Sequence, residues 1–238
     1  LFGKNTIAGA LNITTGQPTE EFEGYVSVGR TSELDATTFT SVVSGPLSDN
    51  VRGRLAVRSY EDDGYMTNNA DGEDAPQTDS LYVRGTLAVD LNDEWTATIK
   101  AEHGYHDVIG RQEIISKVGG GASAFYGLPV GSTNFEPDSG YTTYEQNVRD
   151  FPLFDDTESN ILQLTLDGTF VDHGIKLVVA GTDYEFTNSL DTDYGPLKLL
   201  NRGRTEEHDQ FSAELILSSD TGGNFEYLAG AFYQKEEL

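Results

Sequence analysis

Apolar and polar residues alternate one by one along most of this chain, in segments separated by loops. Residues 81–91, for example, place Leu81, Val83 and Leu87 on one side, with Tyr82 and Arg84 on the other. Because successive side chains of a strand point to opposite faces, this period predicts strands with one apolar and one polar face. The pattern predicts an all-β fold with about nine strands. The alternation is weak in the first two strands. The predicted strands are residues 22–30, 36–45, 51–60, 81–91, 95–102, 162–170, 175–184, 210–218 and 225–235.

Short and long connections alternate between these strands. The short ones are residues 46–50, 91–94, 172–174 and 220–224, and the long ones are 62–79, 106–157 and 187–206. In an antiparallel meander all the long connections then lie at one end. Short periplasmic turns and long outer loops are the layout of an outer-membrane β-barrel. Strands of roughly ten residues, tilted by about 45°, are long enough to cross the hydrocarbon core of a bilayer.

A water-soluble antiparallel sheet would show the same alternation, with one face on a core and one in solvent. Three features favour the membrane barrel: the length of the strands, the long connections at one end, and aromatic residues beside the short turns. On this interpretation Trp95 and Leu164 face lipid, while Thr165 faces the interior. The aromatic residues near the turns are Trp95, Phe170, Phe225 and Tyr227.

Composition narrows the classes of partner. The 238 residues include 15 Lys and Arg against 40 Asp and Glu, a formal net charge of −25, so nucleic acid is not an expected partner. The chain has no cysteine, which excludes disulfides and thiolate metal sites. No apolar run is long enough for a transmembrane helix, so this chain could cross a bilayer only as strands closed into a barrel.

The sequence shows no set of catalytic groups, and we predict that the chain is not an enzyme and has no catalytic residue, cofactor or resident metal. His103 and His106 stand at the base of a long loop, where a chance pair is favoured over a metal site. Residues 119–121 are three glycines without the lysine of a phosphate-binding loop. The acidic insert at residues 62–79 contains no Lys or Arg, and it either solvates the outer surface or tolerates cations.

The first residues, LFGKNTIAGALNITTGQPTEEFEGYVSVG, resemble the junction between plug and barrel in TonB-dependent outer-membrane receptors. The later segments SGPLSDNVRGRLAV and DQFSAELILSSDTGGNFEYLAGAFYQKEE resemble barrel hairpins of the same family. One departure is Ala8-Gly9, where the family usually has two glycines. The resemblance therefore runs across the chain and is strongest near its two ends.

The resemblance implies a domain division. Residues 1–18 would be the C-terminal end of the plug domain, and residues 19–238 the N-terminal part of the barrel. The family's barrel has about 22 strands, and about nine strands cannot close to that diameter. The remaining strands, most of the plug and the TonB box would belong to a longer protein.

The resemblance also implies a function, which is TonB-dependent active transport of a scarce substrate across the outer membrane of a Gram-negative bacterium, by a multi-pass barrel. The substrate would be a ferric siderophore, haem, a vitamin or a carbohydrate. Expected partners are outer-membrane lipid, this small-molecule substrate, and TonB with its inner-membrane complex, through the missing N-terminal region. The alternatives are a non-transporting all-β surface binding protein and a passive porin.

The candidate substrate-binding residues follow from parity and from their position near the long loops. Aromatic rings combined with guanidinium groups suit a sugar, a catecholate or another planar anion. Packing of the barrel wall against the plug would explain the same residues equally well. The candidates are Arg58, Tyr60, Tyr82, Arg84, Tyr184 and Phe186.

Overall fold

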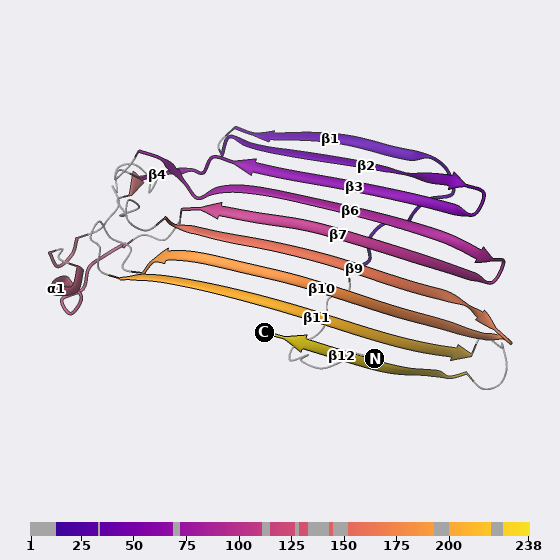
Figure 1. The fold of residues 1–238 in the computed structure, drawn as a ribbon. Helices are drawn as coiled ribbons and strands as arrows, with labels where there is room; N and C mark the ends of the chain where they lie inside the picture. Colours follow the sequence, from indigo (N-terminus) through magenta and orange to yellow (C-terminus); the bar gives the residue numbers. More distant parts are fainter. Residues whose placement is uncertain are drawn as a thin grey trace.

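The structure is a computed structural model, and it describes residues 13–32, 34–68, 72–110, 115–126, 129–132, 143–144, 152–192, 200–219 and 226–238. Among them, nine strands form one antiparallel sheet in the order β1-β2-β3-β6-β7-β9-β10-β11-β12 (Figure 1). The predicted all-β fold is therefore confirmed. The strands are β1 (Glu23–Thr31), β2 (Ala36–Ser48), β3 (Val51–Asp62), β6 (Gln77–Asn92), β7 (Trp95–Ile109), β9 (Phe154–Phe170), β10 (His173–Asp191), β11 (Asn201–Ser219) and β12 (Leu228–Glu237).

Several strands are much longer than the predicted ten residues. β9 has 17 residues, and β10 and β11 have 19 each. The predicted bounds of the connection at residues 187–206 were therefore wrong, because β10 continues to Asp191 and β11 begins at Asn201. The apolar pattern stops there while the backbone pairing continues, with Glu185 opposite Glu207. Hydrophobicity marks the apolar part of a strand, whereas its full length depends on hydrogen bonding.

The connections are arranged as predicted, with the long ones at one end of the sheet and tight turns at the other (Figure 1). The turns at residues 49–50, 93–94 and 171–172 are shorter than expected. Val171 and Asp172 both have positive φ, 49° and 63°, as in the type I′ turns that suit the twist of a hairpin. The fourth predicted turn, at residues 220–224, lies outside the described residues.

A second, small sheet lies among the long connections and was not predicted. It consists of β4 (Met66–Asn68), β5 (Asp74–Ala75) and β8 (Thr143–Tyr144), in the order β5-β4-β8, and the short helix α1 (Ser123–Tyr126) belongs to the same long connection as β8. Met66, Val118 and Leu153 are buried here, each at most 3% exposed. Within the residues described, no helix is long and apolar enough to cross a membrane.

The register separates two faces of the main sheet. Ser44, Arg54, Thr86, Lys100 and Gln163 are paired in sequence across five strands and share one face, which we call the inner face. The next row, on the opposite or outer face, contains Gly53, Leu87, Ile99, Leu164 and Val179. The outer aliphatic side chains are exposed, with Leu164 at 43%, whereas Ser44 is 2% exposed. These faces match the predicted parity, with Leu164 and Trp95 outward and Thr165 inward.

The residues before β1 lie against the inner face of the sheet. The Thr19 backbone N–H and hydroxyl both donate to Ser44 Oγ, at 3.0 and 2.8 Å. Arg52 forms an ion pair with Glu20 and a second one with Asp90 at 2.7 Å. Residues 1–12 of the predicted plug segment lie outside the described residues, and residues 13–18 belong to no strand. The boundary at residue 18 therefore stays a prediction.

Candidate functional site

All of the candidate substrate-binding residues lie on the inner face, in three adjacent rows. Arg58 on β3 is directly opposite Tyr82 on β6. Tyr184 on β10 belongs to the same row, through Gly104 and Ser159. Tyr60 and Phe186 are one row closer to the long connections, and Arg84 is one row closer to the turns.

The structure divides these residues into two clusters. The β3–β6 cluster consists of Arg58, Tyr60, Tyr82 and Arg84. The β10 cluster contains the candidates Tyr184 and Phe186, together with the neighbouring residues described below. β7 and β9 stand between β6 and β10. Since neighbouring strands are about 4.8 Å apart, the clusters are separated by about 14 Å along the wall. A ligand that touches both must therefore span that distance.

The two arginines of the β3–β6 cluster differ. Arg84 forms an ion pair with Glu102 at 2.8 Å, and Glu102 also pairs with Lys100 at 3.0 Å. The charge of Arg84 is thus already balanced within the wall. Arg58 is exposed and forms no ion pair with any residue that the structure describes. Within this cluster, Arg58 is the cation available to an anionic ligand.

The tyrosines of this cluster are fixed by their neighbours. A Cβ added to Gly104 would stand 2.5 Å from the Tyr82 ring, so the ring lies across β7 at a position that only glycine leaves open. Tyr82 remains 49% exposed. Burial, followed by a hydrogen bond to Asp62 and the charge of its carboxylate, raises the pKa of Tyr60. The Tyr60 hydroxyl therefore stays protonated at neutral pH.

Sequence reasoning missed two residues of the β10 cluster. The Arg204 guanidinium lies 5.1 Å from the centroid of the Phe186 ring, within the range of a cation–π interaction, and pairs with Glu206 at 3.2 Å. His208 is directly opposite Tyr184. Arg204 was overlooked because it lies in the predicted loop at residues 187–206, and His208 because it precedes the predicted strand at residues 210–218. The signal was present, since Arg204, Glu206 and His208 continue the inward parity of β11.

The histidine pair at the base of the long loop is separated by the sheet. His103 is on the outer face, where its Nδ1 lies 2.8 Å from Asn160 Oδ1. His106 shares the inner row of Tyr60 and Ser80. Side chains on opposite faces cannot bind one ion. Among the residues that the structure describes, no group of three or more His, Cys, Asp or Glu side chains could hold a metal.

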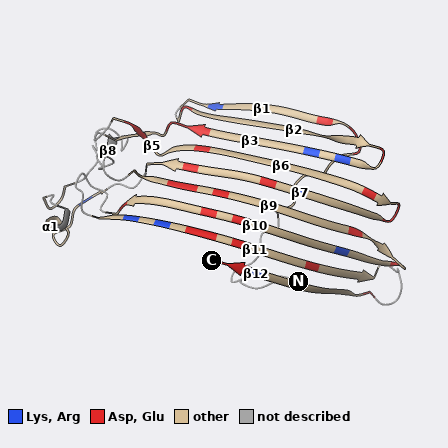
Figure 2. Ribbon diagram, viewed as in Figure 1, with Lys and Arg blue, Asp and Glu red and all other residues tan. Residues whose placement is uncertain are grey.

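The outer face changes character near the height of the candidate site. Toward the turns it presents Leu164, Leu166 and Leu177, and toward the long connections it becomes acidic. Figure 2 shows Asp and Glu positions along the parts of the strands that are near the long connections. Because a charged side chain facing acyl tails is costly, the acidic part belongs outside the hydrocarbon. The candidate residues thus lie at and above the upper limit of the apolar zone. The outward acidic residues include Asp79, Asp107, Asp156, Glu158, Asp183, Glu185, Glu207 and Asp209.

The chain is similar to known receptors. No family model matches it. It is 33% identical to the ferripyoverdine receptor of Pseudomonas aeruginosa over 115 residues, which are 45% of this chain and 12% of that protein. The solved ferric yersiniabactin uptake receptor FyuA of Yersinia pestis matches 93% of this chain with a TM-score of 0.71 and 18% identity. The ferric-catecholate import receptor Fiu of E. coli K12 also matches 93%, with a TM-score of 0.66 and 12% identity.

These matches cover 32% and 35% of the two solved receptors, so the chain spans about a third of their length. The fold is thus part of a larger antiparallel transmembrane β-barrel. The match to the ferripyoverdine receptor supports the resemblance to TonB-dependent receptors that the junction residues indicate. The proteins that the chain matches are transport receptors rather than enzymes, which confirms the prediction that the chain is not an enzyme.

Proposed function

We propose that this chain forms part of the wall of a TonB-dependent transporter that takes up a ferric siderophore across the outer membrane of a Gram-negative bacterium. Haem, a vitamin or a carbohydrate are the other substrate classes that such a barrel could admit. Residues 1–18 would end the plug, residues 19–238 would begin the barrel, and TonB would act through an N-terminal region outside this chain. Outer-membrane lipid surrounds the barrel in this proposal.

The observation that carries the proposal is the combination of an outward aliphatic zone with an inward polar wall that has Arg58 and exposed tyrosine at its upper end. A passive porin needs no chain segment held against its inner wall, whereas here Thr19 bonds to Ser44. A water-soluble surface binding protein would not expose Leu164, Leu87 and Ile99 along one face.

The substrate class follows from the chemistry of the wall and from the names of the similar proteins. The aromatic rings of Tyr82 and Phe186 offer stacking surfaces, and Arg58 offers a guanidinium without a partner among the described residues. This combination suits an anionic, partly aromatic iron chelate. The curated relative is a ferripyoverdine receptor, and the solved receptors compared above are named for yersiniabactin and catecholate iron complexes.

Uptake by the full-length receptor tests this proposal. Cells that depend on it for iron should accumulate a labelled ferric siderophore only while the inner membrane is energised. The Arg58→Ala variant should raise the half-saturating concentration about tenfold, as expected for the loss of one charge-assisted contact worth ~1.4 kcal/mol. Thr165→Ala is the matched control, because Thr165 shares the inner face but lies closer to the turns.

Two results would contradict the proposal, and a third would contradict only the role of Arg58. Accumulation that continues after the inner membrane is de-energised would indicate a passive porin. A full-length protein that is monomeric and water-soluble without detergent would indicate a surface binding protein. Equal half-saturating concentrations for Arg58→Ala and the parent would remove Arg58 from the site while leaving the transport proposal intact.

A further inference from the structure

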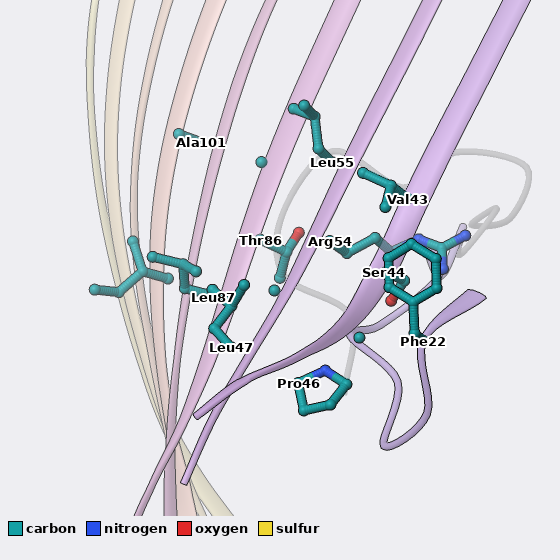
Figure 3. A pocket seen from close by; sticks show the side chains of 14 residues that line it. Phe22, Val43, Ser44, Pro46, Leu47, Arg54, Leu55, Thr86, Leu87 and Ala101 are labelled. Carbon is teal, nitrogen blue, oxygen red and sulfur yellow. The ribbon is translucent and has the colours of Figure 1, made fainter. Parts of the chain in front are cut away.

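A hollow of about 450 Å³ lies in the outer face of the sheet, beside the turn between β2 and β3 (Figure 3). It is bounded by two walls and by two further side chains. Val43 and Leu55 form one wall, and Leu87 and Ile99 form the other. Phe22 and Leu47, both labelled in Figure 3, also border it, and Leu47 lies next to the last residue of β2.

The floor of the hollow is the backbone of the sheet. Gly45 is paired with Gly53, and in the next outer row Gly85 is followed by Ala101. These two small pairs are offset by one row, so the hollow runs diagonally across β2, β3, β6 and β7 as a trench. A Cβ added to Gly53 would meet Leu47 Cδ1 at 2.9 Å, whereas one added to Gly85 would meet nothing within 4 Å. The open space is therefore centred over Gly85.

The trench is lined by apolar side chains that have no protein cover. Phe22 is 78% exposed, Leu47 68% and Leu55 46%. Arg54 contributes to the lining, but its guanidinium belongs to the inner face, where it pairs with Glu23 at 3.0 Å. A ligand in this trench would find hydrocarbon surface and no charged group to bind.

We propose that this trench is a binding site for one acyl chain of a phospholipid. The site depends on the barrel fold and not on the transport proposed above. The trench is continuous with the outward aliphatic zone of Leu164 and Leu166, so the hydrocarbon of the bilayer is what surrounds it. A flexible, linear chain can follow a diagonal trench, and filling it restores the dispersion contacts that an empty space would lose.

The height of the trench identifies the leaflet. It adjoins the 49–50 turn, and short turns of such barrels face the periplasm. The lipid would therefore come from the inner leaflet of the outer membrane. A second copy of the barrel is a poorer fit, because a shallow trench of glycine and alanine bordered by projecting leucines does not complement itself.

Photo-crosslinking in the full-length receptor tests the site. The probe is phosphatidylethanolamine with a photoreactive group in the middle of one acyl chain, incorporated with the receptor into vesicles. We expect adducts concentrated on β3, β6 and β7 around Leu55, Leu87 and Ile99. Gly85→Leu places a side chain in the trench from a position where a Cβ meets nothing within 4 Å, and it should lower labelling of these strands at least about threefold. The effect is modest because packing, rather than a hydrophobic driving force, distinguishes the trench from neighbouring lipid.

Gly181→Leu is the matched control. Gly181 lies in the same outer row as Gly85, and a Cβ there also meets nothing within 4 Å. This variant adds the same side chain to the lipid-facing surface but should leave labelling at Ile99 unchanged. Both variants must first show the heat-modifiable migration of an assembled barrel. If Gly85→Leu does not assemble, Gly85→Ala provides a smaller filling with an intermediate loss of labelling.

Two outcomes would overturn the proposal. Adducts spread evenly over the outer face, with no change in Gly85→Leu or Gly85→Ala, would show that the trench holds no particular chain. Crosslinks at Leu87 or Ile99 to a second copy of the barrel or to another protein would show that a protein covers it.

Discussion

The two halves of the outer face differ in chemistry, one aliphatic and one acidic, although the same strands build both. On the turn side, Leu164 and Leu166 project outward from β9, and on the loop side Glu158 and Asp156 project from the same strand with the same parity. Backbone pairing continues through the change without interruption. Strand length and the height of the apolar zone are therefore set independently, the first by hydrogen bonds and the second by the lipid.

The limit between the two halves runs obliquely across the sheet. In one outer row, Val57 and Val83 on β3 and β6 are apolar, whereas Asp183 and Asp209 on β10 and β11 are acidic. At the turn end, the apolar residues of β9 continue as far as Phe170, whereas β3 begins only at Val51. The apolar zone therefore extends further toward the turns on β9 than on β3. Strands of a barrel are inclined to its axis, so a row perpendicular to them is inclined to the membrane plane. The side chains thus record the direction of the tilt.

The largest expected effect comes from a charge in the turn-side half. Leu164→Arg places a cation toward acyl tails near the middle of the apolar zone and should cost ~2–4 kcal/mol. We expect a large loss of assembled receptor, measured as the heat-modifiable fraction in outer membranes. Thr165→Arg is the control, since Thr165 faces the interior. Equal losses from the two variants would contradict the assignment of the faces.

A smaller effect is expected from the inner wall. Glu102→Gln leaves Arg84 and Lys100 without their shared carboxylate, at 2.8 and 3.0 Å, in a partly buried setting. We expect a loss of ~1 kcal/mol in the free energy of unfolding, measured with urea for the full-length receptor in detergent. Glu158→Gln, in the outward acidic half, should cost nothing. A larger loss in the free energy of unfolding from Glu158→Gln than from Glu102→Gln would contradict this prediction.

The acidic half should also respond to pH. Burial, then the charge of Asp79, raises the pKa of Asp107, and burial, then the charges of Asp107 and Asp155, raises that of Asp156. The folded state therefore holds protons more tightly than the unfolded state. Stability of this region should fall as the pH rises from the ordinary value of 3.8 through the raised pKa values, and the penalty is complete above them.

The variant Asp156→Asn tests this pH dependence. It removes one of the repelling charges, so protease resistance of the loop ends of β7 and β9 should vary less between pH 4 and pH 7, about the window in which raised carboxyl groups titrate. Asp93→Asn, in an exposed turn at the other end, serves as the control. A parent receptor that gains resistance as the pH rises would have the opposite sign and would contradict the prediction.

The smallest effect concerns the turn between β9 and β10. Val171 has a φ of 49°, a conformation that is costly for a β-branched residue and is well suited to asparagine. Val171→Asn should therefore raise the free energy of unfolding by ~0.5–1 kcal/mol. Asp49→Asn, in a turn without a positive φ, should leave it unchanged. A loss of stability in Val171→Asn would show that the valine side chain packs favourably there.

Period-two alternation was sufficient to predict the strands of the main sheet and their faces, because every pair of neighbours in it is antiparallel. The upper parts of β9, β10 and β11 were missed, since acidic residues such as Glu158 and Glu185 replace aliphatic ones on the outward parity. The small sheet was missed because β4 and β8 are two or three residues long and pair only through the tertiary fold.

For the candidate site, parity gave the face of Arg58 and Tyr82. Parity could not give the ion pair that neutralises Arg84 or the contact between Arg204 and Phe186, because both depend on side-chain geometry.

The small sheet has a consequence for recognition of this end of the fold by an antibody. Thr67 pairs with Thr143, which joins two segments that are far apart in the chain into one small sheet. An antibody raised against the native surface there would recognise a composite epitope, and synthetic peptides copied from either segment alone would fail to compete for it.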